Sequence, residues 1–158
     1  MDLLVFFEWL DTSMLASIAK SSGGVFALVQ TVHLASLTVL GGMMLACDLR
    51  LMNLLLKDIP VNVVVENTTR WITYALVGVV LSGIYQSSAV AIKLYYNEFF
   101  WAKMAGFVMG LVFLYAIKLP LVKDGVDEIP PWTLRLVAVA SLTIWFSVAA
   151  TGRWIGFS

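Results

Sequence analysis

Hydrophobic positions form four long runs along this chain, separated by short stretches that carry most of the charges. The runs cover about residues 24–47, 71–92, 99–119 and 132–151. Each is close to the roughly 20 apolar residues that cross a bilayer as a helix. In lipid a segment must satisfy its own backbone hydrogen bonds, and a helix does so. The pattern therefore predicts four membrane-spanning helices, the third stopped by Pro120 and the fourth entered through Pro130 and Pro131.

Residues 1–22 follow a different pattern. The segment opens with an acidic residue and reaches its first lysine only at Lys20, unlike the basic start of a signal peptide. Its apolar side chains recur at helical spacing, at Leu3, Phe6, Phe7, Leu10, Met14 and Ile18. This spacing predicts an amphipathic helix that lies in the membrane interface.

Composition supports the same class of protein. Hydrophobic residues make up 61% and charged residues 13%, against about 25% charged in soluble domains. The formal net charge is zero, which excludes a nucleic-acid binder because such proteins need a basic face. We therefore expect one all-α membrane domain over residues 1–158. It would be an integral-membrane four-helix bundle with an N-terminal interfacial helix, and the lipid bilayer would be its main partner.

Two further patterns predict contacts inside the bundle. Gly106 and Gly110 form a GxxxG motif, and Gly78 and Ser82 form a similar pair of small residues, which favours close helix packing. In the sequence CDLRL, we expect Asp48 and Arg50 to form an ion pair at the membrane edge. Arg70 is a further candidate partner for Asp48.

The only histidine, His33, lies inside the first run, where residues 24–47 carry no formal charge. An ionisable side chain is expensive at that depth and usually faces the interior of a bundle. Three roles remain open for it. It could ligate heme or a metal, handle protons, or fix helix packing through a hydrogen bond to Gln30 or Tyr85.

Helical rise places several other polar residues near the level of His33. At about 1.5 Å per residue, His33 lies about 13 Å and Met109 about 15 Å from the start of their runs. The second and fourth runs reach this level with Tyr85, Gln86, Thr143 and Ser147. Lys103 and Arg153 come nearer to the surface. The spacing predicts a polar layer in one half of the bundle, with two cations above it.

Such a layer suits heme b. Iron takes an imidazole ligand, and the propionates favour cations near an interface. The candidate cofactor-binding residues are His33, Gln30, Tyr85, Met109, Lys103 and Arg153, with His33 as the iron ligand. A single histidine excludes bis-histidine ligation within one chain. It leaves His33 with Met109 or Met104, His33 alone, or a heme shared by two chains, while Lys103 and Arg153 could instead be interfacial cations.

Several short motifs resemble those of a known family. The VHL at 32–34, the glycines at 41–42, the DLRL at 48–51, the FFWAKM at 99–104 and the GRWI at 152–155 resemble an uncharacterised group of small bacterial inner-membrane proteins. The resemblance covers nearly the whole chain. More distantly, the chain is similar to CopD-type copper-resistance domains and HemJ-type protoporphyrinogen oxidases. That similarity implies heme b and redox activity, with His33 and Lys103 at matching positions, although this chain lacks their further histidines.

The leading expectation is a heme-binding electron-transfer protein or subunit in a bacterial inner membrane. A small transporter or channel-like subunit is a second reading, because polar residues within a bundle also line ion paths. A structural subunit of a membrane complex is a third. The sequence shows no HExxH, CxxC or P-loop motif. Little of the chain would lie outside the bilayer, so we expect a homo-oligomer or a membrane or periplasmic partner protein.

Basic residues predict the orientation. Counted over residues 48–70 and 118–135, the connections on one side and the adjoining helix ends carry six lysines and arginines, against four on the other side. The richer side should be cytoplasmic, which places both termini in the periplasm. A reporter that is active only in the cytoplasm, fused to the C-terminus, should therefore stay silent. Strong activity from that fusion would show the opposite orientation.

Overall fold

The computed structural model describes residues 3–123 and 129–157, and every element in that part of the chain is helical. Four long helical stretches are long and apolar enough to cross a membrane, judged by length and composition. They are α3 (Gly23–Leu51), α4 (Val61–Ala89), the continuous stretch α6 (Glu98–Val112), η1 (Phe113–Lys118) and α7 (Leu119–Lys123), and α8 (Pro131–Trp154). The expectation of an all-helical chain with four long apolar helices is confirmed.

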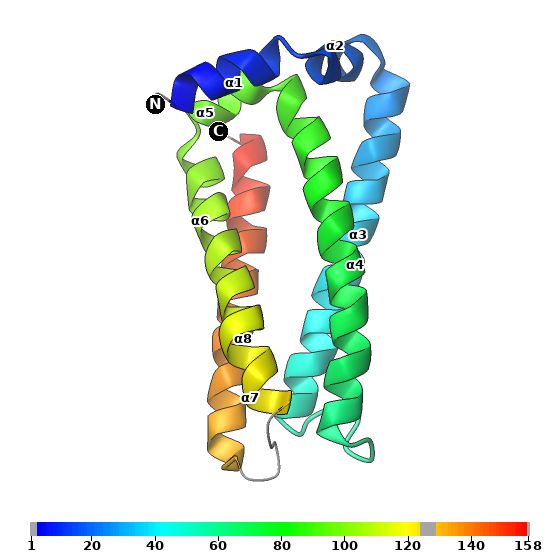
Figure 1. Ribbon diagram of the computed structural model, residues 1–158, viewed down its shortest axis with the longest axis vertical. Helices are drawn as coiled ribbons and strands as arrows, with labels where there is room; N and C mark the ends of the chain where they lie inside the picture. The colour runs from blue at the N-terminus through cyan, green and yellow to red at the C-terminus, as the bar shows by residue number, and fades with distance from the viewer. Residues whose placement is uncertain (1–2, 124–128, 158) are drawn as a thin grey trace.

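The long helices form two pairs (Figure 1). Helix α3 packs along α4, and α6 packs along α8. Contacts of α3 with α8 and of α4 with α7 join the two pairs. The pairs lie close together where α7 meets the end of α3, and they diverge toward the end that carries both termini. We call these the loop end and the terminal end.

Small residues set the distance between α3 and α4. A Cβ added to Gly78 would collide with the Oγ atom of Ser36, so only glycine allows this approach. Toward the loop end the pair buries a continuous apolar core. Its members on these two helices are Leu40, Met44, Cys47, Leu51, Val65, Ile72, Ala75, Leu76 and Val79.

The GxxxG motif on α6 packs against α8. A Cβ on Gly106 would lie 3.1 Å from Val148, and one on Gly110 would lie 3.2 Å from the ring of Trp145. Phe107 meets the same tryptophan edge to face, with ring centroids 6.1 Å apart. The prediction that these glycines mediate helix packing is confirmed, and the contact is made within one chain.

The third long helix does not stop at Pro120, as the sequence led us to expect. It continues to Lys123 through the π-helical segment η1, where the N–H of Leu119 donates to the carbonyl of Leu114. A proline ring clashes with the carbonyl four residues earlier in an α-helix. Wider π turns relieve that clash, so the chain stays helical past the proline.

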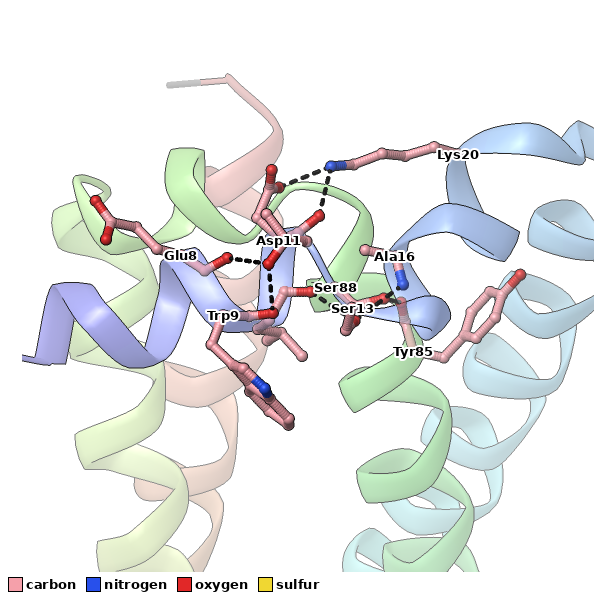
Figure 2. Close-up of polar contacts among 10 residues, drawn as sticks. Glu8, Trp9, Asp11, Ser13, Ala16, Lys20, Tyr85 and Ser88 are labelled. Atoms are coloured by element: carbon pink, nitrogen blue, oxygen red, sulfur yellow. Dashed lines mark hydrogen bonds and ion pairs between the residues drawn. The ribbon is translucent and has the colours of Figure 1, made fainter.

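The N-terminal segment is two helices rather than one. Helices α1 (Leu3–Asp11) and α2 (Met14–Ser21) lie across the terminal end (Figure 1). The break occurs at Ser13, whose Oγ donates to the carbonyl of Leu10 at 2.6 Å and accepts from the N–H of Ala16 at 3.2 Å (Figure 2). Such side-chain bonds compete with continuous helix. Across the bend, Lys20 pairs with Asp11 at 2.9 Å.

Two neighbouring phenylalanines on α1 have different environments. Phe7 is only 6% exposed and packs on Tyr95 of α5 (Ala91–Tyr95) and on Phe100 and Trp101 of α6. Phe6 is 53% exposed. The inner face of α1 is therefore docked on the protein, and its outer face presents apolar side chains to the surroundings.

This difference predicts separable effects. Phe7→Ala should undock α1, because truncation of a buried phenylalanine costs about 3–5 kcal/mol. Limited proteolysis in detergent should then cleave within residues 3–21 much faster than in the unmodified protein. The matched variant Phe6→Ala should leave the cleavage rate unchanged. Equal protection in both variants would show that Phe7 does not hold α1 in place.

Candidate functional site

His33 projects from α3 toward α4 and is half-buried there. Its Nδ1 atom lies 2.8 Å from Oγ of Ser82. The Ser82 hydroxyl donates in turn to the carbonyl of Gly78, one turn earlier on α4. A serine hydroxyl has only one proton. With that proton on the Gly78 carbonyl, the geometry favours a His33 that donates through Nδ1–H, which would leave the lone pair of Nε2 free.

Neither residue predicted to bond His33 does so. Gln30 is exposed, and Tyr85 lies nearly one turn beyond Ser82 along α4. The expectation of a Gln30 or Tyr85 partner is therefore wrong. The cause is the register in which helices α3 and α4 pack, which places Gly78 opposite Ser36 and Ser82 opposite His33.

Tyr85 instead contributes an unpaired polar atom to the terminal half. Its hydroxyl is buried and has no hydrogen-bond partner among the described residues. The backbone carbonyl of Tyr85 accepts from Oγ of Ser88 at 2.7 Å, while the ring extends away from that contact (Figure 2). A buried hydroxyl without a partner is costly, so this atom is available to a ligand or a water molecule.

The two predicted cations differ. Lys103 on α6 is half-buried, makes no ion pair in the described part of the chain, and lies against Gly152, where an added Cβ would be 3.4 Å from its Cε. Its charge is close enough to act on His33. Arg153 is exposed and stacks on Phe157, with its Cζ atom 4.3 Å from the ring centroid. Lys103 is therefore the cation that is free to meet an anionic group.

The rest of the expected polar layer does not join His33. Thr143 and Ser147 on α8 are exposed, and each donates to a carbonyl of its own helix at 2.8 Å. Met109 on α6 is 54% exposed. Its role as a second iron ligand stays a prediction.

A second polar cluster, near the loop end, was missed by the sequence analysis. Asp48 on α3 and Lys118 at the end of η1 are both fully buried and form an ion pair. Lys118 also donates to Oγ of Ser141 on α8 at 3.4 Å. Cys47 and Thr68 adjoin the pair. All four long helical stretches therefore contribute to this cluster, which we call the loop-end cluster.

The expected pairing of Asp48 with Arg50 or Arg70 is wrong. Arg50 turns outward and donates to the carbonyl of Ile59 at 2.8 Å, which closes the connection between α3 and α4. Arg70 lies 4.0 Å from Glu66 on its own helix. Two residues along a helix point to different faces, so adjacency in CDLRL was a poor guide to pairing.

Lys118 was misplaced because Pro120 was taken as the end of a helix, which put the lysine in the last turn of the run, where it was counted with the connection that follows. Its apolar neighbours Ile117 and Leu119 were the available signal. Since Lys118 is buried and paired, it does not belong in the basic count that predicts orientation. The six residues on that side become five, against four.

No group of three or more His, Cys, Asp or Glu side chains that could hold a metal ion occurs among the residues that the structure describes. This leaves His33 as a single imidazole donor. Its free Nε2, the Tyr85 hydroxyl and the Lys103 ammonium are the polar atoms that the terminal half offers to a ligand.

Comparison with known proteins identifies a family without an assigned activity. No curated protein and no solved structure matches the chain. The family of unknown function DUF6644 matches residues 6–158, almost the whole chain. This agrees with the expected membership of an uncharacterised group, and the chain belongs to the family of unknown function DUF6644.

Proposed function

We propose that this chain is a multi-pass protein of a bacterial inner membrane that binds heme b through Nε2 of His33 and serves in electron transfer. The observation that carries the proposal is the hydrogen-bond chain from His33 through Ser82 to the carbonyl of Gly78. It gives the imidazole the tautomer that a metal ligand needs, with Nδ1–H donated and Nε2 bare. The four long apolar helices support the membrane location.

The residues around His33 fit a heme in two respects. Imidazole is a common axial ligand of heme iron. Lys103 is a half-buried cation without a partner in the described chain, and it suits a propionate. When bound, heme would supply a one-electron iron couple.

Each side chain then has a distinct task. His33 holds the group, Ser82 fixes the orientation of the imidazole, and Lys103 neutralises a carboxylate near the terminal end. A second protein ligand would come from Met109, Met104 or another copy of this chain, or His33 would hold the group alone. The distant similarity to CopD-type and HemJ-type proteins belongs to this proposal, as does a homo-oligomer that shares one heme between two chains.

A second candidate function is a small transporter or channel-like subunit. The observation that favours it is the buried ion pair between Asp48 and Lys118, because ionisable residues inside a membrane bundle often mark ion or proton paths. That pair lies in the opposite half of the bundle from His33, so the two functions can be tested separately.

The visible spectrum tests the heme proposal. Protein produced with ample heme supply should show a Soret band and, after reduction, α and β bands. His33→Ala should lose these bands but still insert and stay helical, because the change removes only the contacts of one imidazole with α4. Thr38→Ala, on an exposed position of the same helix whose hydroxyl bonds only the carbonyl of Leu34, is the matched control and should keep the full heme content. A colourless wild-type protein would end the heme proposal.

Ser82 provides a sharper prediction. Ser82→Ala removes the acceptor that orients His33, and loss of such a supporting contact weakens metal affinity about 10–100-fold. Titration of heme-free protein with heme should show this decrease. Ser87→Ala, on the same helix and not bonded to His33, should bind heme as the wild type does. Unchanged affinity in Ser82→Ala would mean that Ser82 does not prepare His33 for ligation.

A further inference from the structure

The Asp48 carboxylate in the loop-end cluster is only half satisfied. Its Oδ1 atom accepts from Lys118, whereas its Oδ2 atom is buried and has no hydrogen-bond partner among the described residues. Ionised carboxylates accept hydrogen bonds on both oxygens. A buried polar atom left without a partner in a native protein requires an explanation, such as a catalytic role or a bound water or ion.

The neighbouring groups leave Oδ2 without a bond, although one hydroxyl is near the carboxylate. Lys118 is directed to Oδ1 of Asp48 and to Ser141, and the Ser141 hydroxyl lies within reach of the same carboxylate. Thr68 on α4 donates to the carbonyl of Val64 at 2.7 Å. Lys118 from η1 and the Cys47 thiol from α3 itself are the titratable groups that adjoin Asp48 in the described chain. From α4 and α8 only the hydroxyls of Thr68 and Ser141 face the cluster.

Helix packing alone does not require this pair. Apolar residues surround it on the turns above and below, including Met44, Leu51, Leu114 and Ala138. Well-packed apolar side chains often replace a buried ion pair without loss of stability. A charged pair with one unsatisfied oxygen is therefore a poor choice for packing, and its polar chemistry needs another purpose.

Access to the cluster is short from one side only. Asp48 lies three residues before the end of α3, about 5 Å along the axis, and Thr68 lies seven residues into α4, about 10 Å. In the other direction the interface between α3 and α4 is an apolar layer that contains Leu40, Ile72 and Val79. The loop end is therefore the nearer source of protons or water for Oδ2.

The backbone around Lys118 is also unusual. The lysine closes the π-helical segment η1 two residues before Pro120, and π-helical turns occur frequently at functional sites. Because proline has no N–H, the turn before it also loses one backbone hydrogen bond. The cation is therefore carried by a departure from regular α-helix.

We propose that the Asp48–Lys118 pair is a proton-binding site that is filled from the loop end. A hydronium ion or a buffer acid on that side gives up a proton, and a new O–H bond forms at Oδ2 of Asp48. The carboxylate becomes a neutral acid, and the pair changes from net neutral to one positive charge. This site is independent of His33 and does not rest on heme binding.

Infrared spectroscopy during a pH titration tests this site directly. The titration runs from about pH 8.5 down to about pH 4, a range bounded by the ordinary pKa values of cysteine and aspartate. As the pH falls through this range, wild-type protein should gain the C=O stretching band of a buried carboxylic acid. The double variant Asp48→Leu/Lys118→Met removes both charges and fills their volumes, so it should fold and lack this band. A folded double variant whose pH-difference spectrum equals that of the wild type overturns the proposal.

Two further variants complete the test. Lys118→Met alone removes the cation that favours the carboxylate, so the midpoint of the band should move upward by about 1–3 pH units. Glu66→Gln removes an exposed carboxylate on α4 and should leave the band and its midpoint unchanged. An unchanged midpoint in folded Lys118→Met, or loss of the band in Glu66→Gln, assigns the proton elsewhere and contradicts the site.

Discussion

Polar side chains within an apolar bundle must find their partners on other helices, and these pairings determine which helices of this protein lie together. His33 and Ser82 join α3 to α4. Asp48, Lys118 and Ser141 join α3 to η1 and α8. The first contact is a neutral hydrogen bond, worth about 0.5–1.5 kcal/mol. Removing one partner of a buried ion pair costs about 3–5 kcal/mol. Loss of one member of the loop-end cluster would therefore be the more disruptive change, and the cluster lies where the two helix pairs approach each other closely (Figure 1).

Between these two polar levels lies an apolar layer of α3 and α4, with Leu40, Met44, Ile72 and Val79. Asp48 and His33 are fifteen residues apart on α3, about 22 Å along its axis. The layer separates a loop-end half, whose charges are paired and buried, from a terminal half that offers unpaired groups. The free groups there are the Nε2 lone pair of His33, the Tyr85 hydroxyl and the Lys103 ammonium. A proton site and a cofactor site can thus occupy one small chain without direct contact.

The sequence predicted the helices well because long uncharged runs have few alternative structures. It predicted their ends less well, since Pro120 breaks an α-helix in general but is accommodated here by the π turns of η1. That error placed Lys118 at the edge of the membrane, among the residues of the following connection, and concealed the ion pair. The sequence predicted the depth of His33 but not its hydrogen-bond partner, which is Ser82 and not Tyr85. The partner depends on the register of α3 and α4, which is set by close contacts such as that of Ser36 with Gly78. Those contacts form only in the folded protein, and the periodicity of the sequence does not indicate them.

The central claim is that Ser82 and Gly78 fix His33 as an Nδ1–H imidazole with a bare Nε2. Because this is the only histidine, ¹⁵N-histidine labelling yields the signals of one residue, and nitrogen chemical shifts distinguish the two tautomers. In heme-free protein near neutral pH, we predict a protonated Nδ1 and an unprotonated Nε2, and only the Nε2 signal should change strongly when heme is added. An imidazole protonated on Nε2, with no change on addition of heme, would contradict the account.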